Sequence, residues 1–283
     1  MSQATGQPAF GLAGVMGWPV AHSRSPKIHN YWLEKHKLPG AYVLLPVAPG
    51  ALPVALPGLA ALGFRGCNIT LPHKVDAMAL VQAVDANARR VGAINTIVVQ
   101  PDGSLKGFNN DCYGYIQSLL DAQPGWRADA GPITVLGAGG AARAVVLALA
   151  DRGAREIRLV NRTFEKADVL AKEFGAPVKA LPWSERHAAL ADVALLVNTT
   201  SQGMHGSPLL DLSLDALPRH ALVSDVIYVP LETPLLAAAR LRGHATVNGL
   251  GMLLNQARPA FEAWYGVLPE VTPELRRIIE ATL

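Results

Sequence analysis

Two short stretches of the sequence each end a mostly apolar run in a titratable side chain. The stretch GCNITLPHK runs from Gly66 to Lys74, and the later stretch GFNND ends in Asp111. A ketone reduction needs a proton at the carbonyl oxygen while hydride reaches the carbon, and the reverse reaction needs a base. Free lysine titrates near ~10.4 and needs its surroundings to shift it, while a carboxylate nearby can hold and orient the ammonium. We therefore predict Lys74 and Asp111 as a catalytic pair; a solvated surface salt bridge is the alternative.

Two serines follow the first expected strand, in the stretch GWPVAHSRSPKIHN. The hydroxyls of Ser23 and Ser25, next to the free N–H groups at the start of a helix, make a site that suits a carboxylate. Ser25 has a structural alternative, because a serine followed by proline is typical of a helix N-cap. His22 and His29 could join this site, but neither has a visible partner, and we interpret them as a helix-start hydrogen bond or a surface imidazole.

Asparagines stand at the ends of two further expected strands. Asn95 begins a strand in GAINTI, and Asn109 and Asn110 precede Asp111 at the end of another. Open α/β sheets bind ligands at strand ends, where such short polar side chains can meet. Each asparagine by itself is most often a turn residue. Together with Lys74, the set indicates a site for a polar ligand.

A glycine-rich turn lies between a strand and a helix in PITVLGAGGAARAVVLALADRG. The strand ends at Leu136, the motif Gly137-x-Gly139-x-x-Ala142 follows, and the expected helix runs to Asp151. Glycines let the backbone approach a pyrophosphate, and the helix N-terminus offers unpaired N–H groups to it. A second strand ends about 20 residues further on, as the dinucleotide-binding fingerprint requires. A tight strand-to-helix turn without a ligand is the alternative.

The end of that second strand indicates which dinucleotide binds. NAD sites place Asp or Glu here for the ribose 2′-hydroxyl, whereas NADP needs positive charge for its 2′-phosphate. The sequence reads Asn161-Arg162-Thr163, and arginine offers a planar charged fork that suits phosphate. NADP(H) is therefore the predicted cofactor, with a solvated surface role for Arg162 as the alternative. Glu165 is close in sequence, but we expect it in the next helix, beside Lys166.

The composition is that of a compact globular protein. Of its 283 residues, 50% are hydrophobic and 17% charged, and the net charge is +3, which excludes a disordered chain. The scattered basic residues give no reason to expect a nucleic acid partner. The two cysteines are far apart and fit neither a disulfide framework nor a zinc site, so we expect a cytoplasmic location and no metal. The first ten residues lack the pattern of a signal peptide.

Residues 38–64 carry no charge and are numerous enough to span a bilayer. Five prolines interrupt the stretch, and lipid offers no partners for the carbonyls that they release. We therefore interpret it as a strand followed by a buried helix, and we expect no membrane partner.

Short apolar runs bounded by Gly or Pro alternate with segments of helical period, which is the βαβ pattern of a mainly parallel sheet. The length favours two domains. The expected strands cover residues 10–16, 41–47, 66–70, 95–99 and 105–108, then 133–136, 157–161, 177–181, 193–198, 222–228 and 245–248. Residues 112–120 are interpreted as a helix that crosses between the halves. The tail after Gly249 is expected to be helical, with its last helix starting on Pro273.

These motifs together resemble the shikimate dehydrogenase family, and the match covers nearly the whole chain. GWPVAHSRSPKIHN is similar to the family's G-x-P-x-x-H-S-x-S-P opening, NITLPHK to N-V-T-x-P-x-K, and GFNND to G-x-N-T-D. GAGGAARA and NRT resemble the family's NADP motifs, NTTSQGM its N-x-T-S-x-G-M, and NGLGMLLNQA its closing motif. The resemblance implies the reversible reduction of 3-dehydroshikimate to shikimate with NADPH, in aromatic amino-acid biosynthesis.

The resemblance also implies a two-domain α/β fold. Residues 1–111 and 250–283 would form a substrate-binding domain with a mainly parallel sheet, to which the C-terminal helices return. Residues 112–249 would form an NADP-binding Rossmann domain. The implied partner is a small-molecule substrate rather than nucleic acid or membrane, and a homodimer is an assembly that the sequence leaves open.

The implied site residues have three roles, and no metal ligand is among them. Lys74 and Asp111 are the catalytic residues. The substrate-binding residues are Ser23, Ser25, Asn68, Thr70, Asn95, Tyr228 and Gln256. The cofactor-binding residues are Gly137, Ala138, Gly139, Gly140, Ala141, Asn161, Arg162, Thr163, Lys166, Thr199, Thr200, Ser201, Gly203, Met204, Val226, Gly249 and Met252.

Two positions depart from the family's pattern. Asn110 replaces the usual threonine of G-x-N-T-D, next to Asp111, and we interpret the change as an adjustment of local hydrogen bonds. Lys166 stands where a second phosphate-binding arginine is common, which keeps the charge but loses the bidentate fork. The alternative function is a quinate or dual quinate/shikimate dehydrogenase using NAD(P). A non-catalytic dinucleotide-binding regulator is disfavoured, because it should have lost Lys74 or Asp111.

Overall fold

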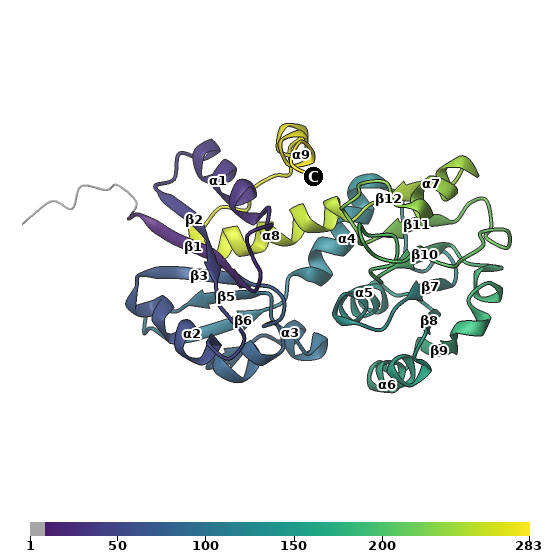
Figure 1. The fold of residues 1–283 in the computed structure, drawn as a ribbon, viewed down its shortest axis with the longest axis horizontal. Coiled ribbons are helices and arrows are strands. Elements are labelled where there is room, and N and C mark those ends of the chain that lie inside the picture. The colour runs from purple at the N-terminus through teal and green to yellow at the C-terminus, as the bar shows by residue number, and fades with distance from the viewer. Residues whose placement is uncertain (1–8) are drawn as a thin grey trace, which may run out of the picture. The chain divides into compact units, whose positions relative to one another are not determined.

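The computed structural model describes residues 9–283, which form two compact units (Figure 1). The first unit contains the described residues up to Asn110 together with Ala257–Thr282, and the second runs from Asp111 to Gln256. Most of the N-terminal stretch in which we expect no signal peptide lies outside the described residues. Which unit binds substrate and which binds cofactor stays a prediction at this point.

The first unit is built on a six-stranded sheet with the order β2-β1-β3-β5-β6-β4. Its strands are β1 (Gly11–Gly17), β2 (Gly40–Pro46), β3 (Phe64–Ile69), β4 (Ala83–Val84), β5 (Thr96–Val99) and β6 (Leu105–Phe108). β5 runs antiparallel to both β3 and β6, whereas the other pairs are parallel. Because β5 is reversed, its first residue lies at the same edge of the sheet as the last residues of β1, β3 and β6.

Helices cover both faces of this sheet. They are α1 (Ser25–Lys35), α2 (Leu52–Ala61), η1 (Asp76–Leu80), α3 (Ala86–Val91), the C-terminal part of α8 (Leu250–Tyr265), and α9 (Pro273–Glu280). One face packs on α2 and η1 through a buried cluster that includes Leu56 and Cys67. Successive side chains of a strand point to opposite faces. The other face meets an aromatic cluster, in which Trp264 of α8 lies against Gly66 of β3.

The C-terminal segment is attached to α1. The Trp32 indole donates a hydrogen bond to the carbonyl of Glu270 (3.1 Å), and the Tyr31 hydroxyl donates to the carboxylate of Glu274 (2.8 Å). α9 starts as expected on Pro273, and the side chain of the preceding Thr272 caps it. This confirms the prediction that the C-terminal helices return to the first part of the chain.

The second unit has a six-stranded, entirely parallel sheet with the order β12-β11-β10-β7-β8-β9. Its strands are β7 (Ile133–Leu136), β8 (Ile157–Asn161), β9 (Val178–Pro182), β10 (Leu195–Asn198), β11 (Leu222–Asp225) and β12 (Thr246–Val247). Its helices are α4 (Asp111–Ala122), α5 (Gly140–Asp151), α6 (Phe164–Phe174), η2 (Trp183–Glu185), η3 (Ala188–Leu190), α7 (Pro234–Leu241) and the start of α8. This strand order is that of the dinucleotide-binding doubly wound fold, with its topological switch between β7 and β10.

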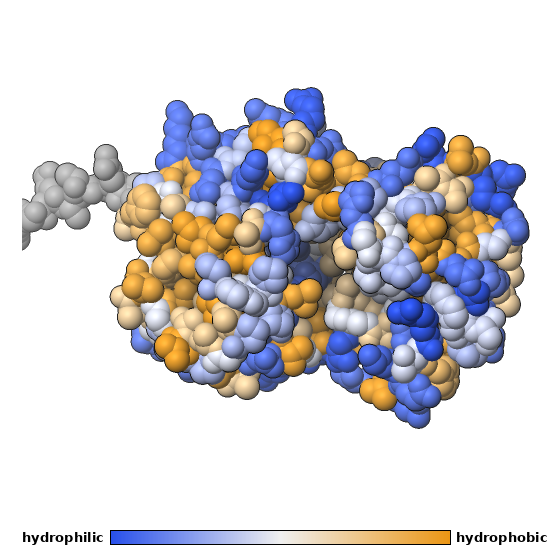
Figure 2. All heavy atoms as spheres, in the orientation of Figure 1, coloured by the Kyte–Doolittle hydropathy of each residue, from blue (hydrophilic) through white to orange (hydrophobic). Residues whose placement is uncertain are grey.

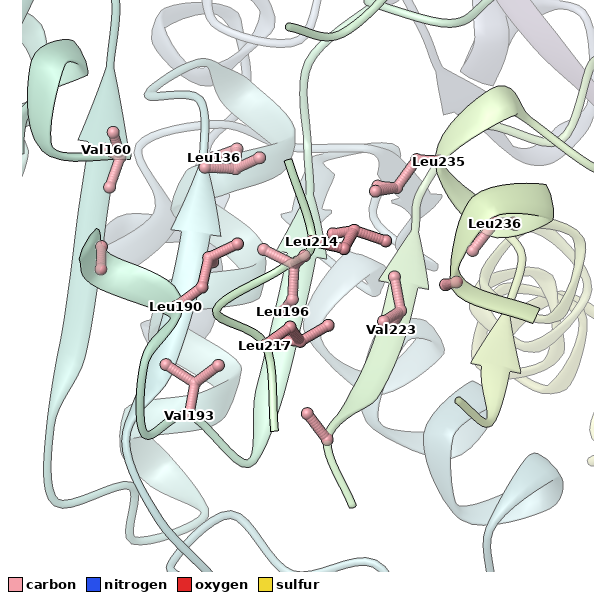
Figure 3. Close-up of a cluster of buried hydrophobic side chains, with 13 residues drawn as sticks. Leu136, Val160, Leu190, Val193, Leu196, Leu214, Leu217, Val223, Leu235 and Leu236 are labelled. Atoms are coloured by element: carbon pink, nitrogen blue, oxygen red, sulfur yellow. The ribbon is translucent and has the colours of Figure 1, made fainter. Parts of the chain in front are cut away.

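Both faces of the second sheet are buried, as parallel sheets require. Figure 3 shows Leu136, Leu196 and Val223 pointing from their strands toward Leu190 of η3, the 210–217 segment and Leu235 at the start of α7. The alternate residues of these strands point to the other face. They include Val135 and Val197, whose exposed fractions are also zero, and α5 supplies apolar residues for that face. The edge at the carboxyl ends of β7 and β10 is thereby held between two packed layers.

The expected strands at residues 105–108, 133–136 and 157–161 are confirmed with the same bounds, and the others overlap the observed strands. The expected strand 222–228 is too long, because β11 ends at Asp225, whose side chain turns the chain by accepting from the Ile227 N–H (3.0 Å). The short strand β4 was missed. α2 follows β2 as expected, but it is buried on one face only, and the side chain of Val54 is 81% exposed.

Among residues 9–283, none of the helices combines the length and the apolar character that crossing a bilayer needs. Figure 2 shows hydrophilic side chains across the visible face of both units, with an apolar area on the first unit over β1 and β3. Exposed apolar side chains of this unit include Phe10, Val43 and Leu44.

We predict that Gly66→Ala destabilises the protein by about 3 kcal/mol or more. Gly66 has a φ of +155°, and a Cβ there would lie 2.0 Å from the Ile97 carbonyl oxygen, which accepts the Trp264 indole hydrogen bond. Urea unfolding followed by circular dichroism measures the effect. The matched control is Gly58→Ala in α2, where a Cβ meets nothing within 4 Å; it should gain about 0.5–1 kcal/mol from helix propensity. Equal effects of the two substitutions would contradict the prediction.

Candidate active site

The predicted substrate residues of the first unit lie along one edge of its sheet. Main-chain hydrogen bonds join the strand ends there: the Thr70 N–H donates to the Met16 carbonyl (2.9 Å), and the Ile69 N–H donates to the Asn95 carbonyl (2.8 Å). The Asn95 N–H in turn donates to the carbonyl of Phe108 (2.9 Å). The edge therefore brings together residues that are far apart in the sequence, as the motifs predicted.

Lys74 lies in the turn that follows β3. Its carbonyl accepts from the Ile94 N–H (2.9 Å), which fixes the turn next to Asn95. His73, its neighbour, is buried, and its Nε2 lies 2.7 Å from the carbonyl oxygen of Val47. His73 thus anchors the turn, while the half-buried Lys74 side chain belongs to the edge. These contacts explain structurally why a titratable pair ends this apolar run.

One hydrogen-bond network joins the buried residues Asn68, Asn95 and Thr96 to the half-buried Asn110. Asn68 Nδ2 donates to the Thr96 hydroxyl (3.1 Å), and the Thr96 hydroxyl donates to Asn95 Oδ1 (2.9 Å). The main-chain N–H of Asn110 donates to the same Asn95 oxygen (3.0 Å), and the Asn110 side-chain amide donates to Thr96 Oγ1 (3.0 Å). Asn110 is therefore part of this network, and the adjustment that it makes relative to the family's threonine stays a prediction.

Ser23 and Ser25 are neighbours at the start of α1, but Ser25 is not the N-cap residue that the structural alternative expected. Ser25 does not cap α1, because it is the first residue of the helix and Arg24 is the residue before it. The Ser25 N–H instead donates to the hydroxyl oxygen of Ser23 (3.3 Å), so the two serines are neighbours at the helix start. Ser25 is buried and Ser23 half-buried, which suits two hydroxyls that face a ligand rather than bulk water.

The two histidines near the serines have separate environments. His22 is exposed. His29 is fully buried, so our interpretation as a surface imidazole was wrong for this residue; its ring stacks on Tyr42 with centroids 4.1 Å apart. Burial lowers the pKa of His29 to about 3, which Asn68 opposes, and the ring is therefore neutral. His29 is part of the aromatic core beneath the edge.

The second unit holds the glycine-rich turn as the sequence predicted. β7 ends at Leu136, Gly139 is the N-cap residue of α5, and no side chain caps this helix. Gly137 has a φ of +103°, and a Cβ there would lie 2.7 Å from the Thr199 hydroxyl. At Gly139 and Gly140 a Cβ would meet nothing within 4 Å. The first glycine is thus required by the fold, whereas the other two leave open space at the helix N-terminus, which fits a pyrophosphate.

Arg162 and Thr163 follow the end of β8 and are exposed. The Asn161 side chain donates to the Thr163 carbonyl (2.8 Å), which fixes the turn. Thr163 is the N-cap residue of α6, but its side chain makes no cap hydrogen bond. Glu165 lies in α6, as expected, and so does the exposed Lys166. The turn therefore presents positive charge and a hydroxyl where a 2′-phosphate would bind.

A buried carboxylate, Asp225, organises the loops after β10 and β11. Asp225 accepts from the Asn198 amide (3.1 Å to each oxygen) and from the Thr233 hydroxyl (2.8 Å). Burial raises the pKa of Asp225, against the opposing effect of its hydrogen bonds, Ile227 N–H foremost.

The network reaches the predicted cofactor residues of these loops. Asn198 Oδ1 accepts from the N–H of Thr200 (3.0 Å) and from its hydroxyl (2.8 Å). The Thr199 hydroxyl donates to the Leu136 carbonyl (2.6 Å), at the glycine-rich turn. Ser201, Gly203 and Met204 continue this loop, which follows β10.

Gly249 approaches Val226 closely, since a Cβ on Gly249 would lie 2.0 Å from the Val226 carbonyl oxygen. This contact joins the loop after β11, which also contains Tyr228, to the start of α8. In α8, Met252 and Gln256 pack on α4 at Gly114, whose own Cβ would meet Gln256 at 2.6 Å. Gly114 lies about one helical turn after Asp111, the first residue of α4. Lys74 belongs to the first unit and Asp111 to the second, and their action as a pair stays a prediction.

Fold and site together define a two-unit α/β protein with a dinucleotide-binding sheet, the class to which NAD(P)-dependent dehydrogenases belong. Two family models match the chain: "Shikimate dehydrogenase substrate binding domain" over residues 15–97 and "Shikimate / quinate 5-dehydrogenase" over residues 125–206. A protein of Paramagnetospirillum magneticum named shikimate dehydrogenase (NADP(+)) is 53% identical over 95% of this chain and 97% of its own length. The chain belongs to the shikimate dehydrogenase family.

Solved structures agree with this assignment. A shikimate 5-dehydrogenase from Thermus thermophilus, in complex with NADP(H) and shikimate, is 37% identical with a TM-score of 0.86 and covers 96% of this chain and 100% of its own. A quinate dehydrogenase from Corynebacterium glutamicum, in complex with NAD, is 28% identical with a TM-score of 0.89, with coverage of 96% and 100%. The fold is thus common to enzymes of both names, and the choice between them rests on side chains.

We predict that Gly139→Ala weakens NADPH binding at least about tenfold while it costs less than about 1 kcal/mol of stability. The added methyl enters the open space at the N-terminus of α5 and meets no protein atom within 4 Å. Fluorescence titration with NADPH and thermal unfolding measure the two effects. Gly125→Ala, also with open space around its Cβ but outside the glycine-rich turn, is the control and should change neither. If the Gly139→Ala protein binds NADPH as tightly as the wild type, the assignment of the pyrophosphate to this turn is wrong.

Proposed function

We propose that this protein catalyses the reversible, NADPH-dependent reduction of 3-dehydroshikimate to shikimate, in aromatic amino-acid biosynthesis. The observation that carries the proposal is the polar edge of the first unit, where paired serine hydroxyls, buried amides and Lys74 line one end of the sheet. Relatives that are more than half identical over 95% of this chain bear the name shikimate dehydrogenase (NADP(+)). The quinate alternative has its support from a less similar protein, at 28% identity.

Each group in the proposed mechanism has a separate task. The Ser23 and Ser25 hydroxyls bind the substrate carboxylate. Ring hydroxyls are bound by Asn68, Thr70, Asn95, Tyr228 and Gln256. In the direction of oxidation, Lys74 and Asp111 orient the reacting hydroxyl and accept its proton; in reduction they return a proton to the carbonyl oxygen. When bound, NADP(H) supplies the hydride chemistry, with its pyrophosphate at residues 137–141 and its 2′-phosphate at Arg162, Thr163 and Lys166.

Steady-state oxidation of shikimate and of quinate, each with NADP and with NAD, tests the proposal by four values of kcat/KM. We expect the shikimate and NADP pair to dominate. Comparable values with quinate or NAD would assign the protein to the alternative, a quinate or dual dehydrogenase. No oxidation of either acid would refute both.

The cellular location and the assembly belong to the same proposal. The cytoplasm is the proposed location, since Cys67 and Cys112 are both free thiols and a reducing compartment keeps them so. The homodimer that the sequence left open is tested by sedimentation velocity of the purified protein.

We predict that Lys74→Ala lowers kcat for shikimate oxidation by at least about a hundredfold, because general acid–base groups typically contribute that much. Binding of shikimate and NADP should stay measurable, since the residue acts mainly on the transition state. Stopped-flow turnover and equilibrium titration separate the two quantities. Lys35→Ala, at the exposed end of α1, is the control. Turnover near that of the wild type would remove Lys74 from the mechanism.

We predict that Arg162→Ala weakens NADPH about ten- to a hundredfold, through loss of charge-assisted hydrogen bonds to the 2′-phosphate. NADH, which lacks that phosphate, should change by less than about threefold. Titration of both nucleotides against both proteins gives the ratio. Arg155→Ala, whose side chain is 81% exposed beside Asp129, should affect neither nucleotide. Equal losses for NADPH and NADH would contradict the assignment of Arg162.

A further inference from the structure

Tyr42 lies beneath the polar edge of the first unit, where its hydroxyl meets Asn68. It belongs to β2, its side chain is 2% exposed, and its ring stacks on His29. Its hydroxyl donates a hydrogen bond to Asn68 Oδ1 at 2.7 Å. Burial raises the pKa of Tyr42 well above its ordinary value, against an opposing effect of Ser25, so the hydroxyl keeps its proton at neutral pH. The tyrosine is therefore a permanent donor to the amide of Asn68.

The opposite end of the Asn68 amide is also fixed. Its nitrogen donates to the main-chain carbonyl of Asn95 (3.1 Å) and to the Thr96 hydroxyl (3.1 Å). A carbonyl oxygen can only accept, so the amide atom that faces it must be the nitrogen. Both hydrogens of the Asn68 amide are thereby used within the protein, and it is the carbonyl oxygen that retains capacity for a further bond.

We propose that Tyr42 is a positioning residue: its hydroxyl holds the Asn68 amide so that Asn68 accepts, rather than donates, a hydrogen bond at the substrate. The proposal rests on the proposed function, in which Asn68 binds a ring hydroxyl. Tyr42 acts through Asn68 rather than on the substrate, since the hydrogen of its hydroxyl is given to Asn68. A carbonyl oxygen has two lone pairs. Tyr42 occupies one, and the proposal assigns the other to a ring hydroxyl of the substrate.

The arrangement makes Asn68 selective for a donor. A ring hydroxyl can give its hydrogen to Asn68 Oδ1, whereas a fluorine in the same place has no hydrogen to give. An asparagine free to turn could present either its oxygen or its nitrogen and would discriminate less. Residues that fix the amide therefore contribute to the choice of substrate without contacting it.

Tyr42→Phe tests the proposal, because it removes the hydroxyl and keeps the ring that stacks on His29. We expect KM for shikimate to rise about five- to tenfold, as loss of one hydrogen bond to a binding group predicts. KM for NADP should stay unchanged. Tyr31→Phe is the matched control: Tyr31 lies in the same unit, and its hydroxyl contacts Thr272 and Glu274. It should leave both constants as they are.

A double-mutant cycle with Asn68→Ala separates positioning from a merely structural role. If Tyr42 acts through Asn68, adding Tyr42→Phe to Asn68→Ala should raise KM no further. An equal rise in both backgrounds would overturn the proposal, as would an unchanged KM in Tyr42→Phe. A lower kcat at constant KM, with a lower unfolding temperature, would also overturn it, because that is the signature of a smaller folded fraction.

If Tyr42→Phe does not fold, the wild type and Asn68→Ala still decide the question with shikimate analogues that carry fluorine in place of single ring hydroxyls. The proposal expects one such analogue to bind the wild type at least about fivefold more weakly than shikimate, and expects this difference to vanish in Asn68→Ala. If none of the analogues behaves in this way, the proposal is refuted. A wild type that oxidises no shikimate defeats the proposed function first; an active wild type with a normal Tyr42→Phe defeats only the present inference.

Discussion

The fold of the first unit depends on hydrogen bonds that satisfy a few buried polar atoms at one edge of its sheet. Thr96 Oγ1 donates to Asn95 and accepts from the amides of Asn68 and Asn110, which uses the whole bonding capacity of a hydroxyl. Buried polar groups without partners cost free energy. The network is satisfied only when β3, β5 and β6 have their observed register, so the geometry of the site and the pairing of the strands are one constraint.

The reversed strand β5 makes that constraint possible. In a sheet of parallel strands only, residues that begin a strand and residues that end one lie at opposite edges. Because β5 is antiparallel, Asn95 and Thr96 at its start meet Asn68 at the end of β3 and Asn110 beyond the end of β6. The second unit needs no such reversal: the loops after β7, β8, β10 and β11 all follow carboxyl ends, and one carboxylate, Asp225, joins the last two.

The sequence was informative where a residue type is rare for its position. Lys74, Asn95 and the glycines after β7 interrupt apolar runs, and motifs of this kind mark the ends of strands. Tyr42 could not be found in this way, because a tyrosine in an apolar strand is typical of a core. Its role depends on Asn68, which is 26 residues away in the sequence. The alternative that Ser25 caps α1 was wrong for a local reason. A serine followed by proline does not show whether the serine is the N-cap residue or the first residue of the helix.

The replacement of the family's threonine by Asn110 affects the same hydrogen bonds of the Thr96 hydroxyl. A threonine hydroxyl at this position could either donate or accept, and Thr96 could then bond in more than one direction. The amide nitrogen of Asn110 can only donate, so Thr96 Oγ1 must accept there and give its own hydrogen to Asn95. Thr96 also accepts from Asn68, so in this arrangement both acceptor positions of its hydroxyl are used. Asn110 thus gives Thr96 a second donor, while the Asn68 amide is oriented separately, by the Asn95 carbonyl at its nitrogen and by Tyr42 at its oxygen.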